Sequence, residues 1–206
     1  GFWLGASPES LLKLEGKSVS TMSLAGTQVY KSSEQVEWDT KNIEEHAFVT
    51  DYLLEVLSDY LDPIKTSGPH TLRAGELLHL QTLVSGRLKP THNSLKQLLR
   101  AMHPTPAVCG TPRNRALEFI NSKESYDREF YAGFFGELNI PKESAFRNSK
   151  RNIENRAYQT VHKSTQLAVN LRCMQLKDTL AILYSGGGIT KDSDPLTECM
   201  ETENKI

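Results

Sequence analysis

The stretch FWLGASPESLLKLEGKSVSTMSLAGT, from Phe2 to Thr27, decides the fold class. An apolar run from Phe2 to Ala6 is typical of a short strand, and a Ser-Pro pair ends it. Two further runs, Leu11 to Leu14 and Ser18 to Leu24, are separated by Glu-Gly-Lys, which favours a tight turn. Consecutive short strands joined by turns predict an antiparallel meander.

Helices are predicted further along the chain. From Asp39 or Thr40, apolar residues follow helical spacing as far as Leu61, and Asp62-Pro63 ends that helix. Ser94 to Met102 and Arg113 to Asn121 have the pattern of two shorter helices. Strands are predicted at residues 72–84, 126–140, 165–174 and 179–184, loops at 29–37, 64–70 and 103–112, and a polar hairpin extension at 141–163.

The composition is that of a globular protein with room for one sizeable core. The 206 residues are 38% hydrophobic and 24% charged. A formal net charge of −1 gives no overall field for nucleic acid or an anionic membrane, so neither is expected as a partner. Three widely spaced cysteines without a CxxC pair favour free thiols in a reducing compartment, and the cytoplasm is the expected location.

The C-terminal stretch DSDPLTECMETENK, Asp192 to Lys205, contains the strongest helix start. Asp194 followed by proline is a good N-cap, and it places Glu198, Glu201 and Lys205 on one helical face. With the preceding glycine run SGGGI, such a face can hold a hard cation beside an anionic ligand. A solvated acidic face with a Glu–Lys pair is the simpler alternative, and spacing alone favours it.

Four other places carry candidate chemistry, each with a plain structural alternative. Glu9 follows the first strand and could be a surface carboxylate. Gly26 and Thr27 can present N–H groups and a hydroxyl to an anion, or form an ordinary turn. Glu45, in the first turns of a helix, either complements the helix dipole or binds metal. His79 lies in an apolar strand, where a hydrogen-bonded core histidine is commoner than a catalytic one.

The order of several sequence blocks resembles a known family over nearly the whole chain. These blocks are GASPESLLKLEG, SLAGT, TKNIEEHAFVTDYL, LLHL, MHPTPAVCGTP, YDREFYAGFFG, LAVNLRCM, YSGGGITKDSDP and ECMETENK. They are similar to the catalytic portion of the chorismate-utilising enzymes, which comprise isochorismate synthase, salicylate synthase, and the large subunits of anthranilate and aminodeoxychorismate synthases. The resemblance implies an α+β fold of antiparallel sheets packed in layers with flanking helices, and an active site in a cleft between the layers.

The resemblance also implies roles for individual residues. Catalytic roles fall to Glu9, which matches the acid that protonates the departing C4 hydroxyl, and to His79, which matches a pocket histidine near the ring. Metal-binding roles, for Mg²⁺, fall to Glu45, Glu198 and Glu201. Substrate-binding roles fall to Gly26, Thr27, Ala107, Tyr131, Arg172, Gly188 and Lys205.

The implied substrate, chorismate, explains these residue types. It is a dianion, so its site needs an arginine, backbone N–H groups and a divalent cation. Ala107 stands where members that transfer ammonia carry threonine, which favours water as the nucleophile and isochorismate as the product. GELNI, NLRCM and GGGITKDSDP are similar to the isochorismate synthases of menaquinone synthesis, and siderophore synthesis is the alternative pathway. Anthranilate, aminodeoxychorismate or salicylate synthesis is the alternative activity.

Two departures from the family pattern lead to further expectations. Asn42 stands where the family usually has an acidic residue. No lysine here matches the family's general base, which belongs to an upstream strand block, and the chain begins at Gly1 without methionine. We therefore expect residues 1–206 to be the C-terminal part of a single catalytic domain. Alone, this part is expected to be inactive or only to bind chorismate, and to self-associate through exposed sheet edges.

Overall fold

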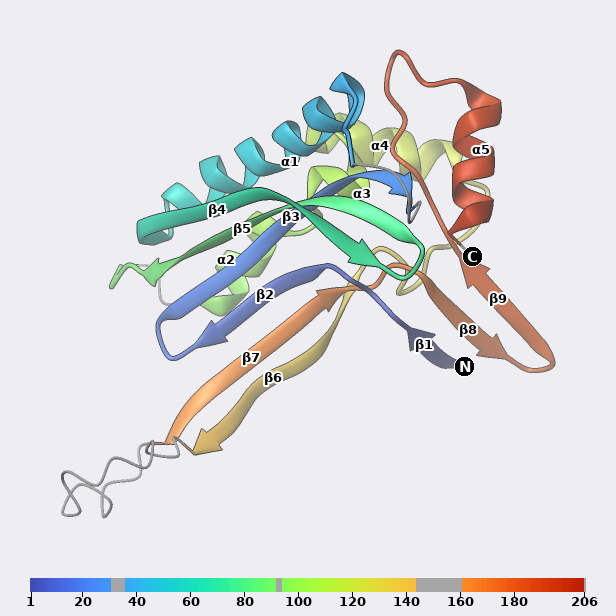
Figure 1. Ribbon diagram of the computed structural model, residues 1–206. Helices are drawn as coiled ribbons and strands as arrows, with labels where there is room; N and C mark the ends of the chain where they lie inside the picture. Colours follow the sequence, from blue (N-terminus) through green and yellow to red (C-terminus); the bar gives the residue numbers. More distant parts are fainter. Residues whose placement is uncertain (31–35, 92–93, 144–160, 206) are drawn as a thin grey trace, which may run out of the picture.

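The protein is built on two antiparallel sheets, one of six strands and one of three, with helices on one side of the larger sheet (Figure 1). The structure, a computed structural model, describes residues 1–30, 36–91, 94–143 and 161–205. The expected α+β fold with antiparallel sheets and flanking helices is confirmed.

The elements have the following bounds. The strands are β1 (Phe2–Gly5), β2 (Ser10–Glu15), β3 (Ser18–Val29), β4 (Leu61–Ala74), β5 (Leu77–Leu88), β6 (Phe134–Glu143), β7 (Val161–Val169), β8 (Cys173–Lys177) and β9 (Leu180–Tyr184). The helices are α1 (Thr40–Ser58), α2 (Leu95–Met102), α3 (Pro106–Cys109), α4 (Arg113–Lys123) and α5 (Pro195–Asn204).

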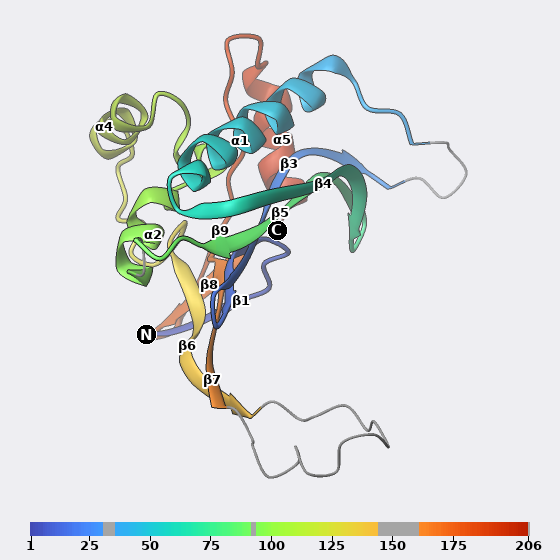
Figure 2. The same ribbon diagram turned by 90° about the vertical axis from the view of Figure 1, so that its left-hand side faces the viewer.

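The larger sheet has the strand order β4-β5-β3-β2-β7-β6. The meander predicted at the start of the chain supplies β2 and β3, which pair around the Gly16 turn, while β1 joins the smaller sheet instead. Helix α1 lies along one face of the larger sheet (Figures 1 and 2) and buries Leu53 and Leu57 against Val19 and Val84 of β3 and β5. This contact forms the main core, and it fixes the position of the helix that carries Glu45.

The smaller sheet has the order β1-β8-β9 and a small aromatic core. Tyr184 stacks on Trp3 and on Tyr131, with ring centroids 5.1 and 5.2 Å apart. Residues 170–172 connect β7 of the larger sheet to β8 of the smaller one. Arg172 therefore lies at the junction of the two sheets, not inside a strand as the sequence pattern at 165–174 predicted.

Three other local predictions need correction. Residues 64–70 form part of β4, not a linker, because β4 is an edge strand and an edge tolerates the prolines that disfavour a central strand. Residues 106–109 form a short helical turn with proline at its start. In the stretch 126–140, strand β6 begins only at Phe134. The predicted hairpin extension at 141–163 falls mostly outside the described residues, as does part of the loop at 29–37.

Replacing Leu57 with alanine is expected to cost about 2–5 kcal/mol of unfolding free energy. Leu57 is fully buried between α1 and the sheet, so the shorter side chain leaves a cavity in the main core. Phe48, on the same helix and 66% exposed, is the matched control, and its alanine variant should change stability by at most about 0.5 kcal/mol. Urea unfolding of both variants measures the difference, and equal losses would contradict this assignment of the core.

Candidate functional site

Glu9 is a buried carboxyl in the link between β1 and β2. Glu9 is 4% exposed, and burial raises the pKa of its carboxyl group to about 8. It borders an open hollow of about 580 Å³, together with Phe135 of β6 and Gln166 of β7. At neutral pH this carboxyl is therefore mostly protonated, as a general acid must be.

His79 and Arg172 are in direct contact, although one lies in β5 and the other at the junction of the sheets. Arg172 Nη2 is 2.8 Å from His79 Nε2. On its other side, His79 Nδ1 lies 3.2 Å from both the carbonyl oxygen of Gly26 and Oγ1 of Thr27. Burial, reinforced by the Arg172 charge, lowers the pKa of His79 to about 4. The structure thus brings together four of the residues assigned to substrate binding or catalysis.

Asn42 joins this group to the start of α1. Its Oδ1 accepts a hydrogen bond from the Thr27 backbone N–H at 2.9 Å, and its Nδ2 donates to the capping residue Asp39. The Thr27 N–H, expected to be available to an anion, is therefore already used within the protein. The Thr27 hydroxyl remains on the His79 side of the turn.

The three predicted metal-binding carboxylates lie on neighbouring helices, α1 and α5, with a lysine among them. Lys41 Nζ is 2.9 Å from Glu198 Oε1 and 3.8 Å from Glu45 Oε1. Burial raises the pKa of Glu45; Lys41 opposes the rise, and the charges of Glu201 and Glu198 add to it. Burial opposes ionisation of Glu198 most strongly, but its hydrogen bonds to Lys41 and Ser193 and the charges of Lys41 and Lys205 together outweigh burial and keep its pKa below the usual value.

Lys205 and the glycine run connect the acidic helix to the rest of the site. Lys205 Nζ lies 2.6 Å from Glu201 Oε1 and 3.2 Å from the carbonyl oxygen of Gly186. A Cβ added to Gly186 would lie 2.5 Å from the Tyr131 hydroxyl, so any side chain at this position would have to displace that hydroxyl. Burial raises the pKa of Tyr131 to about 12, so its hydroxyl stays protonated and can donate a hydrogen bond.

Gly187 of the glycine run faces the acidic residues Glu198 and Glu201. A Cβ at Gly187 would lie 3.7 Å from Glu198 Oε2 and 4.0 Å from Glu201 Oε1, whereas one at Gly188 would have no neighbour within 4 Å. Tyr131, Lys205, Glu201 and Glu198 are therefore linked through the glycine run. Ala107 is exposed on α3, and in the described part of the chain no side-chain hydrogen bond or ion pair joins Ala107 or the Glu9 carboxyl to this group.

The three carboxylates do not form a ready cation site. Within the described ranges, no three His, Cys, Asp or Glu side chains lie close enough together to hold a metal ion. The expectation that Glu45, Glu198 and Glu201 lie within reach of one cation is therefore not met in this arrangement, and Lys41 supplies the positive charge among them. The donor chemistry still suits Mg²⁺, which prefers carboxylate oxygens, and the Lys41 side chain is 42% exposed.

Sequence reasoning missed two residues of this group. Lys41 precedes Glu45 by four positions, a spacing that predicts a helical ion pair, but its stronger partner Glu198 is far away in sequence. In the sequence, Asn42 stands out only as a departure from the family pattern. Its contact with Thr27 depends on how α1 packs against β3, which no local pattern shows.

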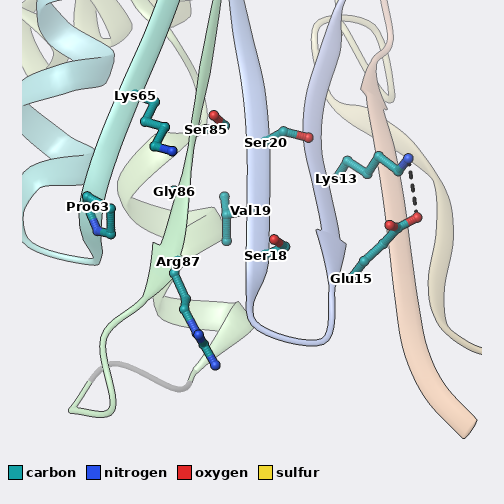
Figure 3. A pocket seen from close by; sticks show the side chains of 10 residues that line it. All are labelled: Lys13, Glu15, Ser18, Val19, Ser20, Pro63, Lys65, Ser85, Gly86 and Arg87. Carbon is teal, nitrogen blue, oxygen red and sulfur yellow. Dashed lines mark ion pairs between the residues drawn. The ribbon is translucent and has the colours of Figure 1, made fainter. Parts of the chain in front are cut away.

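A second hollow, of about 400 Å³, lies elsewhere on the larger sheet (Figure 3). A polar row crosses the strands there, in which Lys65 pairs with Ser85, Ser85 with Ser20, and Ser20 with Lys13. Its one carboxylate, Glu15, is exposed and forms an ion pair with Lys13 at 3.2 Å. None of the predicted site residues lines this hollow.

Comparisons with known proteins agree on one family. Residues 1–151 match the family model described as chorismate binding enzyme, and residues 157–206 match a second model with the same description. The isochorismate synthase EntC of Escherichia coli is 31% identical over the full chain and 49% of its own length. The chain thus spans about half the length of the curated relatives it matches.

Solved structures give the same result. The isochorismate synthase DhbC of Bacillus anthracis aligns with a TM-score of 0.79 at 29% identity, over 99% of this chain and 52% of that one. Anthranilate synthase component I of Streptococcus pneumoniae aligns with a TM-score of 0.77 at 27% identity, over 98% of this chain and 42% of that one. No helix in the described part of the chain is long and apolar enough to cross a membrane. The chain belongs to the chorismate-binding enzyme family.

Proposed function

We propose that the protein acts as an isochorismate synthase in the cytoplasm, converting chorismate to isochorismate. Water adds at C2 and releases one proton, the ring double bond shifts, and the C4 hydroxyl accepts one proton and leaves as water, so that one water is gained and one is lost. The observation that carries the proposal is the state of Glu9, because hydroxide is a poor leaving group and a buried carboxyl with a pKa of about 8 can protonate it at neutral pH.

The cationic and polar groups suit the dianionic substrate. Arg172 can bind a carboxylate with two parallel N–H groups. Thr27, Tyr131 and Lys205 add a hydroxyl, a phenol and an ammonium group from three different elements. Ala107 and Gly188 are proposed to border the ring and a carboxylate, as the family resemblance implies. Water as the nucleophile is supported by Ala107 and by the isochorismate synthases among the relatives.

Glu45, Glu198 and Glu201 are proposed to hold Mg²⁺. When bound, the ion neutralises the ring carboxylate and so favours departure of the hydroxyl group. The residues themselves provide the oxygen ligands and keep the helices α1 and α5 together through Lys41. Because Lys41 lies between two of these carboxylates, cation binding requires its ammonium group to leave.

Replacing Lys41 with methionine is therefore expected to tighten Mg²⁺ binding by about tenfold, since the cation no longer competes with an ammonium group. The metal-free protein should also lose stability, because the buried Glu198 loses its hydrogen-bond partner. Calorimetric titration and metal-dependent melting temperatures measure both effects. Lys191, 89% exposed, provides the control substitution. Weaker binding by the Lys41→Met variant would show instead that Lys41 organises the metal ligands.

Product analysis tests the reaction. The protein is incubated with chorismate and Mg²⁺, and the products are resolved by chromatography; isochorismate is expected as the main product. Similarity to anthranilate synthase is nearly as strong as to the isochorismate synthases, so the fold alone does not separate the alternatives. Anthranilate, aminodeoxychorismate or salicylate as the main product would contradict the proposal that isochorismate is formed by addition of water.

The second candidate is a chorismate-binding chain that does not turn its substrate over alone. It is favoured by the absence of a lysine matching the family's general base and by the length of the relatives, of which this chain matches about half. The polypeptide of residues 1–206 and the isochorismate synthase EntC of Escherichia coli are assayed side by side. Turnover by residues 1–206 within about tenfold of that of EntC would exclude this candidate, because loss of a general base costs about 10²- to 10⁴-fold.

A further inference from the structure

The contact between His79 and Arg172 determines which nitrogen of His79 carries a proton. A guanidinium group can only donate hydrogen bonds, so His79 Nε2, 2.8 Å from Arg172 Nη2, must be the acceptor. The proton of the neutral ring is then on Nδ1. From there it points toward the carbonyl oxygen of Gly26 and the Thr27 hydroxyl, each at 3.2 Å.

Both ring nitrogens of His79 are therefore already used within the protein. Its ring is held on one side by the turn at Gly26 and on the other by Arg172, and the residue is 6% exposed. A proton-transfer role would need a free nitrogen facing the substrate and a pKa near the working pH. Burial and the neighbouring Arg172 charge instead keep His79 neutral.

Arg172, by contrast, depends on this contact. It is a half-buried, non-glycine residue with a left-handed backbone (φ 47°), in the short connection between two sheets. In the described part of the chain, no acceptor other than His79 holds its guanidinium group. Its remaining N–H groups are consequently available to a carboxylate.

We propose that His79 is a positioning residue whose unprotonated Nε2 orients Arg172 for binding a substrate carboxylate, and that it transfers no proton. This inference rests on the proposed function for the identity of the carboxylate. It changes the role expected for His79 from the sequence, which was catalytic. It also explains why an uncharged acceptor is needed, because a protonated histidine would repel the guanidinium group.

Two substitutions separate positioning from proton transfer. In His79→Gln, the amide oxygen can reach the place of Nε2 and accept from Arg172; in His79→Leu, no acceptor remains. We expect the KM for chorismate to rise by about 10- to 100-fold in the leucine variant, with kcat changed by less than about threefold. The glutamine variant should stay within about threefold of the wild type in both constants. His70→Gln, an exposed histidine of β4, is the control.

A substrate-free measurement tests the geometry by itself. In nitrogen-15 spectra, His79 should remain neutral with its proton on Nδ1 from pH 5.5 to 8. The Arg172 side-chain signals should broaden in the leucine variant and stay sharp in the glutamine variant. If the wild type neither binds nor converts chorismate, the proposed function fails while this measurement still decides the contact.

Three results would overturn the inference. One is a loss of kcat above about 100-fold in both variants with KM unchanged, which would indicate proton transfer. Another is a His79 proton on Nε2. The third is an unchanged Arg172 signal and KM in a folded leucine variant.

Discussion

Replacing Glu9 with glutamine is expected to lower kcat/KM for chorismate by about 10²- to 10⁴-fold. The amide keeps the shape of the carboxyl but cannot protonate a departing hydroxyl group. The wild-type activity should itself decline as the pH rises through about 8, where Glu9 loses its proton. The pH dependence of kcat/KM measures this decline, which should be absent from the residual activity of Glu9→Gln.

The same group makes stability depend on pH. Burial raises the pKa of Glu9 from 4.5 in the unfolded chain to about 8, so the folded protein holds a proton that the unfolded chain releases between these values. The favourable contribution is complete below about pH 4.5 and is lost as the pH rises through 8. We therefore compare the unfolding free energy of Glu9→Gln with that of the wild type at two pH values. The difference, variant minus wild type, should be more favourable to the variant at pH 9 than at pH 5 by at least about 1 kcal/mol.

Glu15→Gln, which changes an exposed carboxylate of the neighbouring strand, is the control for both the activity and the stability measurements. If Glu9→Gln has the same kcat/KM and the same pH dependence as the wild type, Glu9 does not protonate the departing hydroxyl group.

Replacing Glu198 with glutamine is expected to weaken Mg²⁺ binding by at least about 100-fold. Glu198 is 4% exposed, so its charge acts on a cation with little screening by water. The amide also removes the carboxylate on α5 that Lys41 contacts, so the contact between α1 and α5 should loosen. At a fixed Mg²⁺ concentration near the wild-type dissociation constant, turnover should fall in parallel with metal occupancy.

Glu203, exposed on the same helix, gives a matched control. Glu203→Gln makes the same chemical change and should leave metal binding within about twofold, as expected for a screened surface charge. Calorimetric titration of both variants with Mg²⁺ decides the result. If both bind the ion as the wild type does, the carboxylates of α5 are a solvated face and the metal lies elsewhere.

Local signals explain the helices that could be predicted from the sequence. Asp39 and Asp194 each accept a hydrogen bond from a backbone N–H three residues later, as their side chains and positions indicated. Strand β4 was missed because Pro63, Gly68 and Pro69 favour a loop when read locally. The strand forms because β5 supplies partners on either side of two register shifts, at Leu61/Ile64 and Ser67/His70.

The site was predictable as a set of residues but not as a geometry. The family resemblance identifies Glu198 and Arg172 as site residues. Their hydrogen bonds, from Lys41 to Glu198 and from Arg172 to His79, join residues that are far apart in the chain. The burial of Glu9, which raises its pKa, is likewise a property of the packed strands around it. Sequence spacing carries no information about such contacts.

The pairing of β2 with β7 has a consequence for how the protein is made. This pairing joins Ser10 to Ala168, so β2 is synthesised long before β7, the strand with which it pairs. At a ribosomal speed of about 5–20 residues per second, β2 spends roughly 10 to 30 seconds with one edge unpaired. During that interval Leu11 and Leu12, which are buried in the folded protein, remain accessible to chaperones and to neighbouring nascent chains. The yield of active protein in a cell should therefore respond to translation speed and growth temperature more than to the stability of the finished sheet.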